Sequence, residues 1–151
     1  MKNTRFYICE TCGNVIGFID GNPDRITCCG KPMQLIIPNS VDASKEKHLP
    51  YLIDNGEDLI VRVGEVEHPM EEEHYISWIA QVTENETTRI RLRPNEKPEV
   101  RLKNIKGATI YAYCNKHGLW AIENKWVYWR NLYKEVKCKR EKFFNFSCFY
   151  T

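Results

Sequence analysis

The chain has 151 residues, of which 22 are basic and 20 acidic, so its formal net charge is only +2. Its hydrophobic content of 42% is enough for a buried core, which argues against a largely disordered chain. No stretch approaches the roughly 18 consecutive apolar residues of a membrane span, and the nearly balanced charge argues against a nucleic-acid-binding surface.

The N-terminal segment has no apolar stretch followed by a cleavage site, so the sequence predicts a cytoplasmic protein. In that reducing compartment, closely spaced cysteines favour metal or redox roles over structural disulfides. The chain has seven cysteines and four histidines. Five of the cysteines and all of the histidines fall into two groupings with the residue types of metal sites.

Residues 1–37 are predicted to form a small ribbon module. A short strand at 6–8 leads into Cys9, a second strand spans 15–19, and the turn residues at 20–23 reverse the chain toward a second pair of cysteines. A module of this size buries too little apolar surface to fold alone. A bound metal would therefore supply its folding free energy.

The first candidate metal site consists of the four cysteines Cys9, Cys12, Cys28 and Cys29. A C-x2-C pair and a distant second pair can enclose one tetrahedral metal. Because Cys28 and Cys29 are adjacent, they cannot both adopt the relaxed turn of the first pair, so we expect a distorted tetrahedron. Four thiolates suit iron and zinc about equally, which leaves a redox iron and a structural zinc ribbon both open. A Cys28–Cys29 disulfide is a weaker alternative, because it would strand the other two thiols.

Residues 38–122 are predicted to form an antiparallel β-sandwich that follows a linker at 38–40. Short β-type runs, separated by turn residues, recur at 58–63, 75–82, 88–93, 99–103 and 108–113. Several such runs at this spacing are typical of a sandwich, so the whole chain is predicted to be mainly β. Strict alternation directs the arginines of the third run outward. The pattern of the second run places Ile76, Trp78, Ala80 and Val82 on one face.

The second candidate metal site draws its ligands from three separate loops. The ligands are His48, His68, His74, Cys114 and His117. Zinc sites are almost always four-coordinate, so a set of four neutral imidazoles and one thiolate favours iron. Five protein ligands also leave one octahedral position open, which is the position that a substrate needs.

Three motifs carry a resemblance to a known family. They are Glu46-Lys47-His48-x-Pro50, His68-Pro-Met-x3-His74-Tyr-Ile and Tyr113-Cys-Asn-x-His117-Gly-Leu-Trp120. These motifs resemble superoxide reductase, and the four-cysteine ribbon resembles desulforedoxin. A chain that joins the two is similar to desulfoferrodoxin, the two-iron superoxide reductase. The resemblance covers about residues 3–120.

The resemblance implies two irons per chain and a reaction. The four cysteines would bind a rubredoxin-like iron. The four histidines would lie in a plane around the catalytic iron, with Cys114 axial. Superoxide would bind at the open position and be reduced to hydrogen peroxide. Lys47 would attract and orient the anion, and Glu46 would occupy the open position in the resting ferric state.

The resemblance also implies an immunoglobulin-like sandwich, a homodimer and a rubredoxin-like electron donor. It leaves open whether the four-cysteine iron relays electrons or only stabilises its module. Two other functions stay open from the sequence. One is a zinc-ribbon and β-sandwich module that binds a protein or nucleic acid, although it leaves the four histidines unexplained. The other is a non-catalytic iron electron carrier whose second iron is closed to ligands.

Residues 123–151 form a basic, aromatic extension of unknown role that the resemblance does not reach. Aromatic and aliphatic residues at helical spacing between 126 and 136 predict a short amphipathic helix. A loosely packed extension is favoured over a segment that docks on a membrane surface or a partner. Cys138 and Cys148 have no partner motif and are assigned to no metal.

Overall fold

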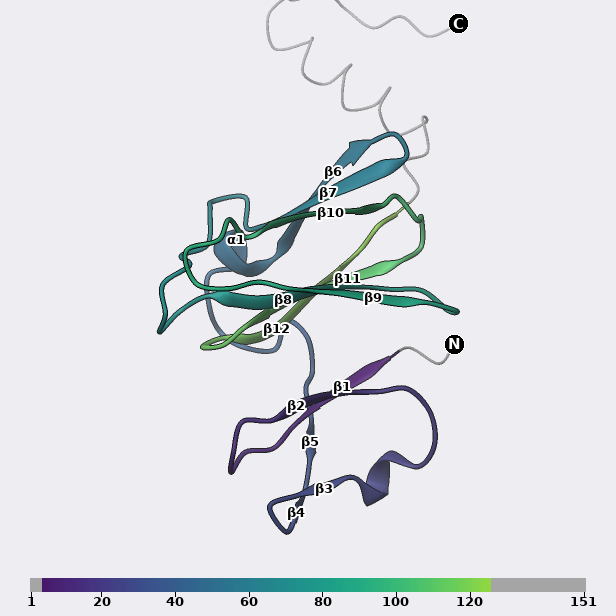
Figure 1. The fold of residues 1–151 in the computed structure, drawn as a ribbon, viewed down its shortest axis with the longest axis vertical. Coiled ribbons are helices and arrows are strands. Elements are labelled where there is room, and N and C mark those ends of the chain that lie inside the picture. The colour runs from purple at the N-terminus through teal and green to yellow at the C-terminus, as the bar shows by residue number, and fades with distance from the viewer. Residues whose placement is uncertain (1–3, 126–151) are drawn as a thin grey trace, which may run out of the picture.

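Two β-rich modules lie one above the other in Figure 1, with the N-terminal module at the bottom. The computed structural model describes residues 4–125. The helix predicted between 126 and 136 and the two unassigned cysteines, Cys138 and Cys148, lie outside the described residues. Within the described range the fold is mainly β and antiparallel, which confirms the predicted fold class.

The N-terminal module is a three-stranded antiparallel sheet with a small hairpin beside it. Its elements are β1 (Arg5–Ile8), β2 (Val15–Phe18), η1 (Pro23–Arg25), β3 (Thr27–Cys28), β4 (Lys31–Pro32) and β5 (Gln34–Leu35). β1 lies between β2 and β5, and β3 pairs with β4. The predicted turn contains η1, a single turn of 3-10 helix that begins after Asn22 and has a proline at its start. The buried core of the module is limited to Tyr7, Cys9 and Met33, as its small size requires.

The second module is a seven-stranded sandwich preceded by one turn of helix. Its elements are α1 (Lys45–His48), β6 (Pro50–Asn55), β7 (Asp58–Val63), β8 (Ile76–Val82), β9 (Thr87–Arg91), β10 (Glu99–Lys103), β11 (Thr109–Cys114) and β12 (Gly118–Glu123). The sequence predicted five of these strands, with ends within two residues of those observed. It missed β6 and β12, which are edge strands of their sheets. The arginines of β9 are exposed, as the alternation predicted.

The strand pairing identifies the type of sandwich. One sheet has the order β10-β7-β6 and the other has the order β12-β11-β8-β9. When strands β6 to β12 are lettered A to G in chain order, the two sheets are ABE and DCFG. An immunoglobulin constant domain has ABED and CFG, so here the fourth strand pairs with the third instead of the fifth. The predicted immunoglobulin-like sandwich is therefore observed, with one strand in the other sheet.

One predicted feature of β8 is wrong: Ile76 does not share a face with Trp78. Tyr113 pairs with Trp78, but the next residue of β11, Cys114, pairs with Ile76, so Ser77 is an extra residue that forms a β-bulge. The bulge turns Ile76 into the sandwich core beside Ile79 and Cys114. A uniform alternation cannot reveal such a bulge, because one extra residue reverses every side chain beyond it.

The N-terminal module packs on the outer face of the four-stranded sheet. Phe6 of β1 contacts Trp78 of β8 and Tyr111 of β11, with ring centroids 5.0 and 5.1 Å apart. Ala80, Val82 and Leu119 complete this buried cluster. The contact explains why nearly every residue of β8 is buried: one face meets the sandwich core and the other meets the first module.

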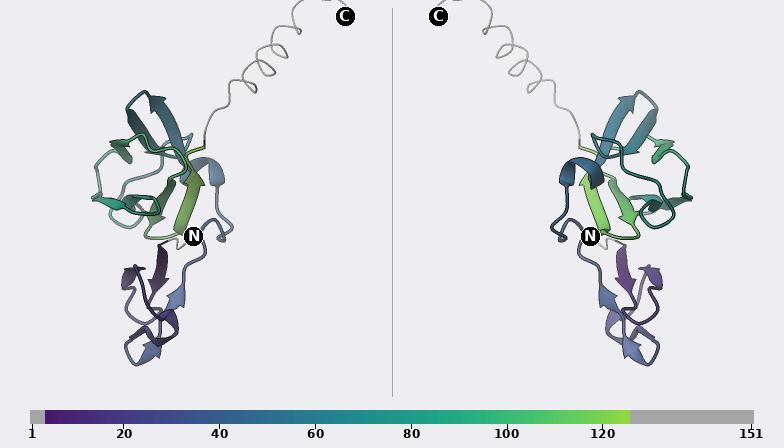
Figure 2. Two further views of the ribbon diagram at one scale, coloured as in Figure 1. Left: turned by 90° about the vertical axis from the view of Figure 1, so that its right-hand side faces the viewer. Right: turned by 90° about the vertical axis from the view of Figure 1, so that its left-hand side faces the viewer.

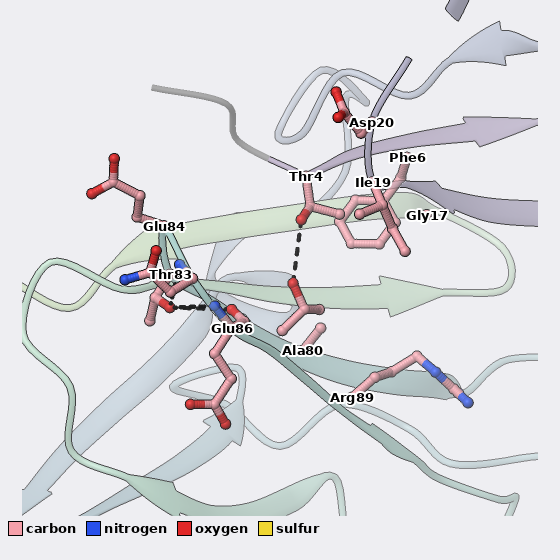
Figure 3. Close-up of a pocket in the computed structure, with 12 residues that line it drawn as sticks. Thr4, Phe6, Gly17, Ile19, Asp20, Ala80, Thr83, Glu84, Glu86 and Arg89 are labelled. Atoms are coloured by element: carbon pink, nitrogen blue, oxygen red, sulfur yellow. Dashed lines mark hydrogen bonds between the residues drawn. The ribbon is translucent and has the colours of Figure 1, made fainter.

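Beside this contact, a groove of about 690 Å³ opens between β2 and the β8–β9 hairpin (Figure 3). The hydroxyl oxygens of Thr4 and Thr87 lie 3.3 Å apart across the module boundary there. None of the predicted metal ligands lines this groove. Two further views show that the modules meet through β1 at one side of the sandwich (Figure 2). None of the helices within residues 4–125 is long and apolar enough to cross a membrane.

The module contact yields a prediction for Phe6→Ala. Truncating this buried ring should lower the free energy of unfolding by about 3–5 kcal/mol, because a cavity remains between the modules. It should also accelerate proteolysis of the connection at 36–40. Phe18→Ala is the control, since Phe18 is partly buried against Tyr7 within its own module. Urea unfolding and limited proteolysis of the metal-loaded protein measure both effects. Equal proteolysis of the two variants would contradict the role of Phe6 at the boundary.

Candidate metal centres

The five predicted ligands of the second site meet at one end of the sandwich. His48 is the last residue of α1, just before β6, whereas His68 and His74 lie in the connection between β7 and β8. Cys114 ends β11, and His117 lies in the turn to β12. In the lettering above, these connections are the B–C and F–G loops, which also carry the binding surface of immunoglobulin variable domains. One ligand atom of each residue lies within 4.8 Å of one from every other.

The four imidazoles form a square. Neighbouring rings, taken in the order His48, His68, His74 and His117, have centroids 4.6 to 4.7 Å apart. Their planes are nearly perpendicular, at 77° to 87°. Across the square, the centroids of His48 and His74 are 6.0 Å apart. Each ring therefore meets its neighbours edge to face, and the four surround one common point.

Hydrogen bonds set which ring nitrogen faces that point. Nδ1 of His48 lies 2.7 Å from the carbonyl oxygen of Ser44, and Nδ1 of His68 lies 2.6 Å from that of Pro69. A carbonyl only accepts, so each Nδ1 must carry the proton and donate it. The Nε2 atom of each ring is then left with a free lone pair, as a metal ligand requires.

The nitrogens that face the centre lack other partners. The Nε2 atoms of His68 and His74 are buried and have no hydrogen-bond partner. Nε2 of His48 is 2.8 Å from Nδ1 of His117. Two nitrogens bound at right angles to one metal at about 2.1 Å would be about 3.0 Å apart. The unpartnered atoms and this spacing both fit a metal ion among the four rings.

The thiol of Cys114 reaches the site from the sandwich core. Its side chain is fully buried and belongs to the core cluster, and Sγ lies 3.7 Å from Nδ1 of His117. The backbone N–H of His117 donates to Sγ at 3.3 Å. His74 and His117 are partly exposed, in contrast to the buried thiol. Among the described residues, no sixth donor joins these five, so a metal with six coordination positions would keep one of them open.

The protonation equilibria of these groups also fit a bound cation. Burial lowers the pKa of His48 and His74, and it lowers the pKa of His68 to about 4. These imidazoles are therefore neutral at pH 7, which is the form that binds metals. Burial raises the pKa of the Cys114 thiol. A thiolate at this position requires a nearby positive charge, and a metal ion would provide it.

Two residues of the Glu-Lys-His motif, Glu46 and Lys47, are exposed and precede the ligand His48 in the chain. Burial is the main reason that the pKa of His48 is lowered, and the positive charge of Lys47 contributes to the lowering. Lys47 is thus close enough to act electrostatically on the cluster. Glu46 is exposed and is not among the clustered ligands. Its carboxylate accepts a hydrogen bond from the Ser44 hydroxyl at 3.0 Å instead.

Three residues that the sequence did not identify hold the ligand loops together. Asn115 accepts from the backbone N–H of Tyr75 at 2.9 Å and donates to the Glu73 carbonyl at 3.2 Å, so it ties the Cys114 turn to the His74 loop. Trp120 stacks on the His48 ring, 5.0 Å away, and its indole N–H donates to the carbonyl of His117. Both residues stand inside a motif quoted above, but neither side chain has a metal-binding group.

The third such residue is Gly64, which has a φ of +83°. A Cβ atom at this position would lie 2.2 Å from the carbonyl oxygen of Val66 and 2.7 Å from that of Lys47. The Gly64 N–H donates to the Leu49 carbonyl at 3.1 Å. This glycine therefore allows the chain leading to His68 to pack directly against the backbone that carries His48.

The four cysteines of the first site also converge. Their sulfurs lie within 4.8 Å of one another, and none forms a disulfide. The Sγ atoms of Cys12 and Cys28 are 3.6 Å apart, and those of Cys28 and Cys29 are 4.0 Å apart. A tetrahedral metal with bonds of about 2.3 Å places its sulfurs about 3.8 Å apart, so the spacing fits one metal. The alternative of a Cys28–Cys29 disulfide is excluded by the distance.

The backbone shows how adjacent cysteines reach one metal. Cys29 has a φ of +51°, in the left-handed region that a residue with a Cβ rarely adopts. A glycine in this region follows each pair, at Gly13 and Gly30, both with a φ of +73°, but in the second pair the cysteine adopts it as well. The two cysteine pairs were expected to differ in geometry. The backbone confirms this, because Cys29 is the member of the four that is held in a strained conformation.

The four thiols cannot all ionise without a cation. The backbone N–H of Cys12 lowers the pKa of Cys9 to about 6. Hydrogen bonding to Cys12 raises the pKa of Cys29 to about 12, and it also raises the pKa of Cys28. Crowded sulfurs share protons in this way when no metal is present, and a metal ion displaces those protons.

Comparisons with known proteins agree over most of the chain. The family model for Desulfoferrodoxin, N-terminal domain, matches residues 2–36, and that for Desulfoferrodoxin matches residues 40–123. The Desulfoferrodoxin of Syntrophotalea carbinolica is 45% identical over 118 residues, which are 78% of this chain and 94% of the relative. That of Desulfarculus baarsii is 43% identical over 127 residues, 82% of this chain and 98% of the relative. The solved structure of the superoxide reductase from Treponema pallidum has a TM-score of 0.64 at 28% identity, covering 82% of this chain and all of that one.

The packing at Gly64 predicts the effect of Gly64→Ala. The new methyl group should push α1 away from the chain leading to His68, which weakens metal binding at the four-histidine site. Gly107→Ala is a matched control, because Gly107 has a φ of +82° but open space around its Cα. Both variants bear the roughly 1–2 kcal/mol cost of a left-handed alanine, but only Gly64→Ala adds the overlap. Thermal unfolding and metal content after dialysis measure the difference. Equal losses in both variants would contradict the role given to Gly64.

Proposed function

Because this chain belongs to the desulfoferrodoxin family, we propose that it is a superoxide reductase, which reduces superoxide by one electron to hydrogen peroxide. One observation carries the proposal: four imidazoles and a buried thiol surround one point, and no sixth donor within residues 4–125 joins them. A purely structural metal site is closed on all sides, whereas a reactive one keeps a position for its substrate.

Iron fits both donor sets. The square of His48, His68, His74 and His117, with Cys114, would hold the catalytic iron, and the four-cysteine group would hold the second. A ferrous iron in the first of these sites supplies the electron and the open coordination position. The remaining steps depend on what the side chains of this chain do around it.

The buried thiol directs the reaction to one face. Because Cys114 lies in the sandwich core, solvent and superoxide would approach from the side where His74 and His117 are partly exposed. The backbone N–H of His117 donates to the sulfur and stabilises its thiolate form. A thiolate ligand would increase the electron density of an iron held at this site, as it does in thiolate-ligated haem.

Lys47 is proposed to attract the substrate. Superoxide is a small anion, and a cation at the mouth of a site raises the rate of encounter with it. The side chain of Lys47 is exposed, and its charge already acts on His48. The lysine therefore adds positive potential at the face where the substrate enters.

Glu46 is proposed to occupy the open position when no substrate is bound. To do so, its carboxylate must give up the hydrogen bond from Ser44. One turn of helix and an exposed side chain leave room for this exchange. The reaction also consumes two protons, which solvent at the exposed face can deliver.

The partners follow from the resemblance and stay predictions. They are superoxide as substrate, a rubredoxin-like electron donor and a second copy of the chain in a homodimer. The predicted cytoplasmic location also stays a prediction, as do the boundaries 1–37, 38–122 and 123–151 and the roles of the individual site residues.

Product stoichiometry tests the proposed reaction. Pulse radiolysis of the reduced, iron-loaded protein should show that each superoxide consumed oxidises one four-histidine iron and yields one hydrogen peroxide. A dismutase would instead release dioxygen as well and leave the iron unchanged overall. A zinc-binding module would be colourless and inert. An electron carrier with a closed iron would fail to bind azide in its oxidised form, and either result would refute a superoxide reductase.

The position of Lys47 predicts the effect of Lys47→Ala. Loss of this charge should lower the second-order rate constant for superoxide roughly tenfold, at the low end of electrostatic steering, and weaken its dependence on ionic strength. Lys103→Ala removes the same charge from β10, beside Asp58 at the far end of the sandwich, and should change neither. Second-order rate constants for superoxide, measured at several salt concentrations, compare the two variants with the parent protein. An unchanged constant for Lys47→Ala would rule out steering by this residue.

A further inference from the structure

The groove between β2 and the β8–β9 hairpin is lined by buried apolar residues and by exposed acidic ones (Figure 3). Phe6 and Ala80 are buried, whereas Ile19, which also lines the groove, is 88% exposed. The charged residues of the lining are three acids and one base, namely Asp20, Glu84, Glu86 and Arg89. Acidic side chains around an exposed isoleucine suit a partner that is both basic and apolar.

The acidic residues of the β8–β9 turn are available to such a partner. Among the described residues, neither Glu84 nor Glu86 forms an ion pair. Glu86 accepts one hydrogen bond, from the hydroxyl of Thr88 at 3.1 Å. The turn itself is fixed, because the backbone N–H groups of Asn85 and Glu86 both donate to the hydroxyl of Thr83. The hairpin therefore presents two carboxylates to a cation.

The C-terminal extension of this chain has the matching composition. Residues 126–151 contain six basic and two acidic side chains, which give a net charge of +4. Nine residues of the same segment are Phe, Tyr or Trp. The segment therefore combines positive charge with large apolar rings, which is the chemistry that suits the groove.

The strand register brings the start of this extension close to the groove. Glu123, the last residue of β12, pairs with Thr109, which pairs in turn with Val82. Val82 pairs with Thr87, a residue of the groove lining. At about 4.8 Å per strand spacing, Glu123 lies roughly 14 Å from Thr87. Side chains two residues apart share a face, and Ala121 packs against the cluster between the modules, so Glu123 points to the face on which the groove opens.

We infer that residues 126–151 pack into this groove and cover the boundary between the two modules. Even at the helical rise of about 1.5 Å per residue, a chain of 26 residues reaches roughly 39 Å, so it spans the distance of roughly 14 Å. Its basic side chains pair with Glu84 and Glu86, and its rings cover Ile19. The extension thereby adds a second connection between the modules to the one at Phe6.

An extension packed in the groove leaves the four-histidine site free. β11 runs from Thr109, beside the end of β12, to the ligand Cys114, and its six residues place these two ends roughly 17 Å apart. The groove therefore opens at the end of the sheet opposite the metal ligands. Packing of the extension and reaction with superoxide can be measured independently of one another.

Carbodiimide cross-linking of the metal-loaded full chain tests the inference. The reagent joins a carboxylate to a lysine amine that contacts it. Glu84 or Glu86 should therefore become linked to lysines of the segment 134–142.

Glu57 is the matched control for these cross-links. Its backbone carbonyl accepts from the N–H of Asn104, whose side chain accepts from Asn124 just before the extension begins. Glu57 is exposed and close to the start of the extension, but it lies outside the groove. Its cross-links to the same lysines should be several times less frequent than those of Glu84.

Substitution of the groove residues measures the packing itself. Glu84→Gln combined with Glu86→Gln removes the charge that holds the extension. Chymotrypsin, which cleaves after aromatic residues, should then cut within 126–151 several times faster. Ile19→Ser should act in the same direction, and Glu57→Gln should not. Visible spectra, metal content and the rate constant for superoxide should match the parent protein in every variant, because none of these residues lies at a metal site.

A mixture of heavy-isotope and ordinary chains identifies what fills the groove. Cross-links between the extension and Glu84 or Glu86 within one chain support the inference. Cross-links only to the extension of a second copy would overturn it. So would cross-links only to residues 1–3, which precede Thr4 at the groove. Absence of any link to the extension, equal linking of Glu57 and Glu84, or unchanged cleavage in the groove variants would also overturn it.

Discussion

The convergence of five donor atoms on one point is the constraint on which the rest of this structure depends. Five donor atoms of His48, His68, His74, Cys114 and His117 face one point, and two of the nitrogens lie 2.8 Å apart. Without a cation, one of these two nitrogens must carry a proton for the other to accept, the Nε2 atoms of His68 and His74 have no partner, and the buried thiol keeps its proton. The carbonyls of Ser44 and Pro69, the side chain of Asn115 and the backbone contact at Gly64 hold the loops in this arrangement. The sandwich acts as a rigid frame whose loops are set for a metal.

Much of the site could be predicted from the sequence because metal ligands belong to few residue types. Each of the four histidines and five of the seven cysteines contributes to one of the two groups. Their chemistry alone separated a closed four-thiolate set from a five-ligand set with an open position. The supporting residues escaped prediction for a physical reason. Gly64, Asn115 and Trp120 act through backbone approach, hydrogen bonds to main-chain groups and ring stacking, and their residue types do not specify these contacts.

The fold likewise has features that the sequence predicted and features that it did not. Alternating strands such as β9 and β10 were predicted because each has one buried and one exposed face. β8 was predicted as a strand but with a wrong face for Ile76, because both of its faces are buried and a bulge at Ser77 interrupts the alternation. β6 begins with a proline, which is tolerated at the start of an edge strand but weakens a strand prediction. Contacts between distant segments decide these features, and periodicity within one segment does not report them.

The uneven exposure of the four cysteines has a consequence for metal exchange. Cys9 is buried, whereas Cys12 and the strained Cys29 are exposed on the surface of a module with little core of its own. The thiol of the other site is enclosed by the sandwich. A chelator or competing ion therefore reaches the four-cysteine metal first, and the left-handed Cys29 gains backbone freedom when its ligand bond opens. The two sites of one chain are kinetically unequal, so a metal-poor cell would hold chains that carry their reactive iron and lack, or have exchanged, the other.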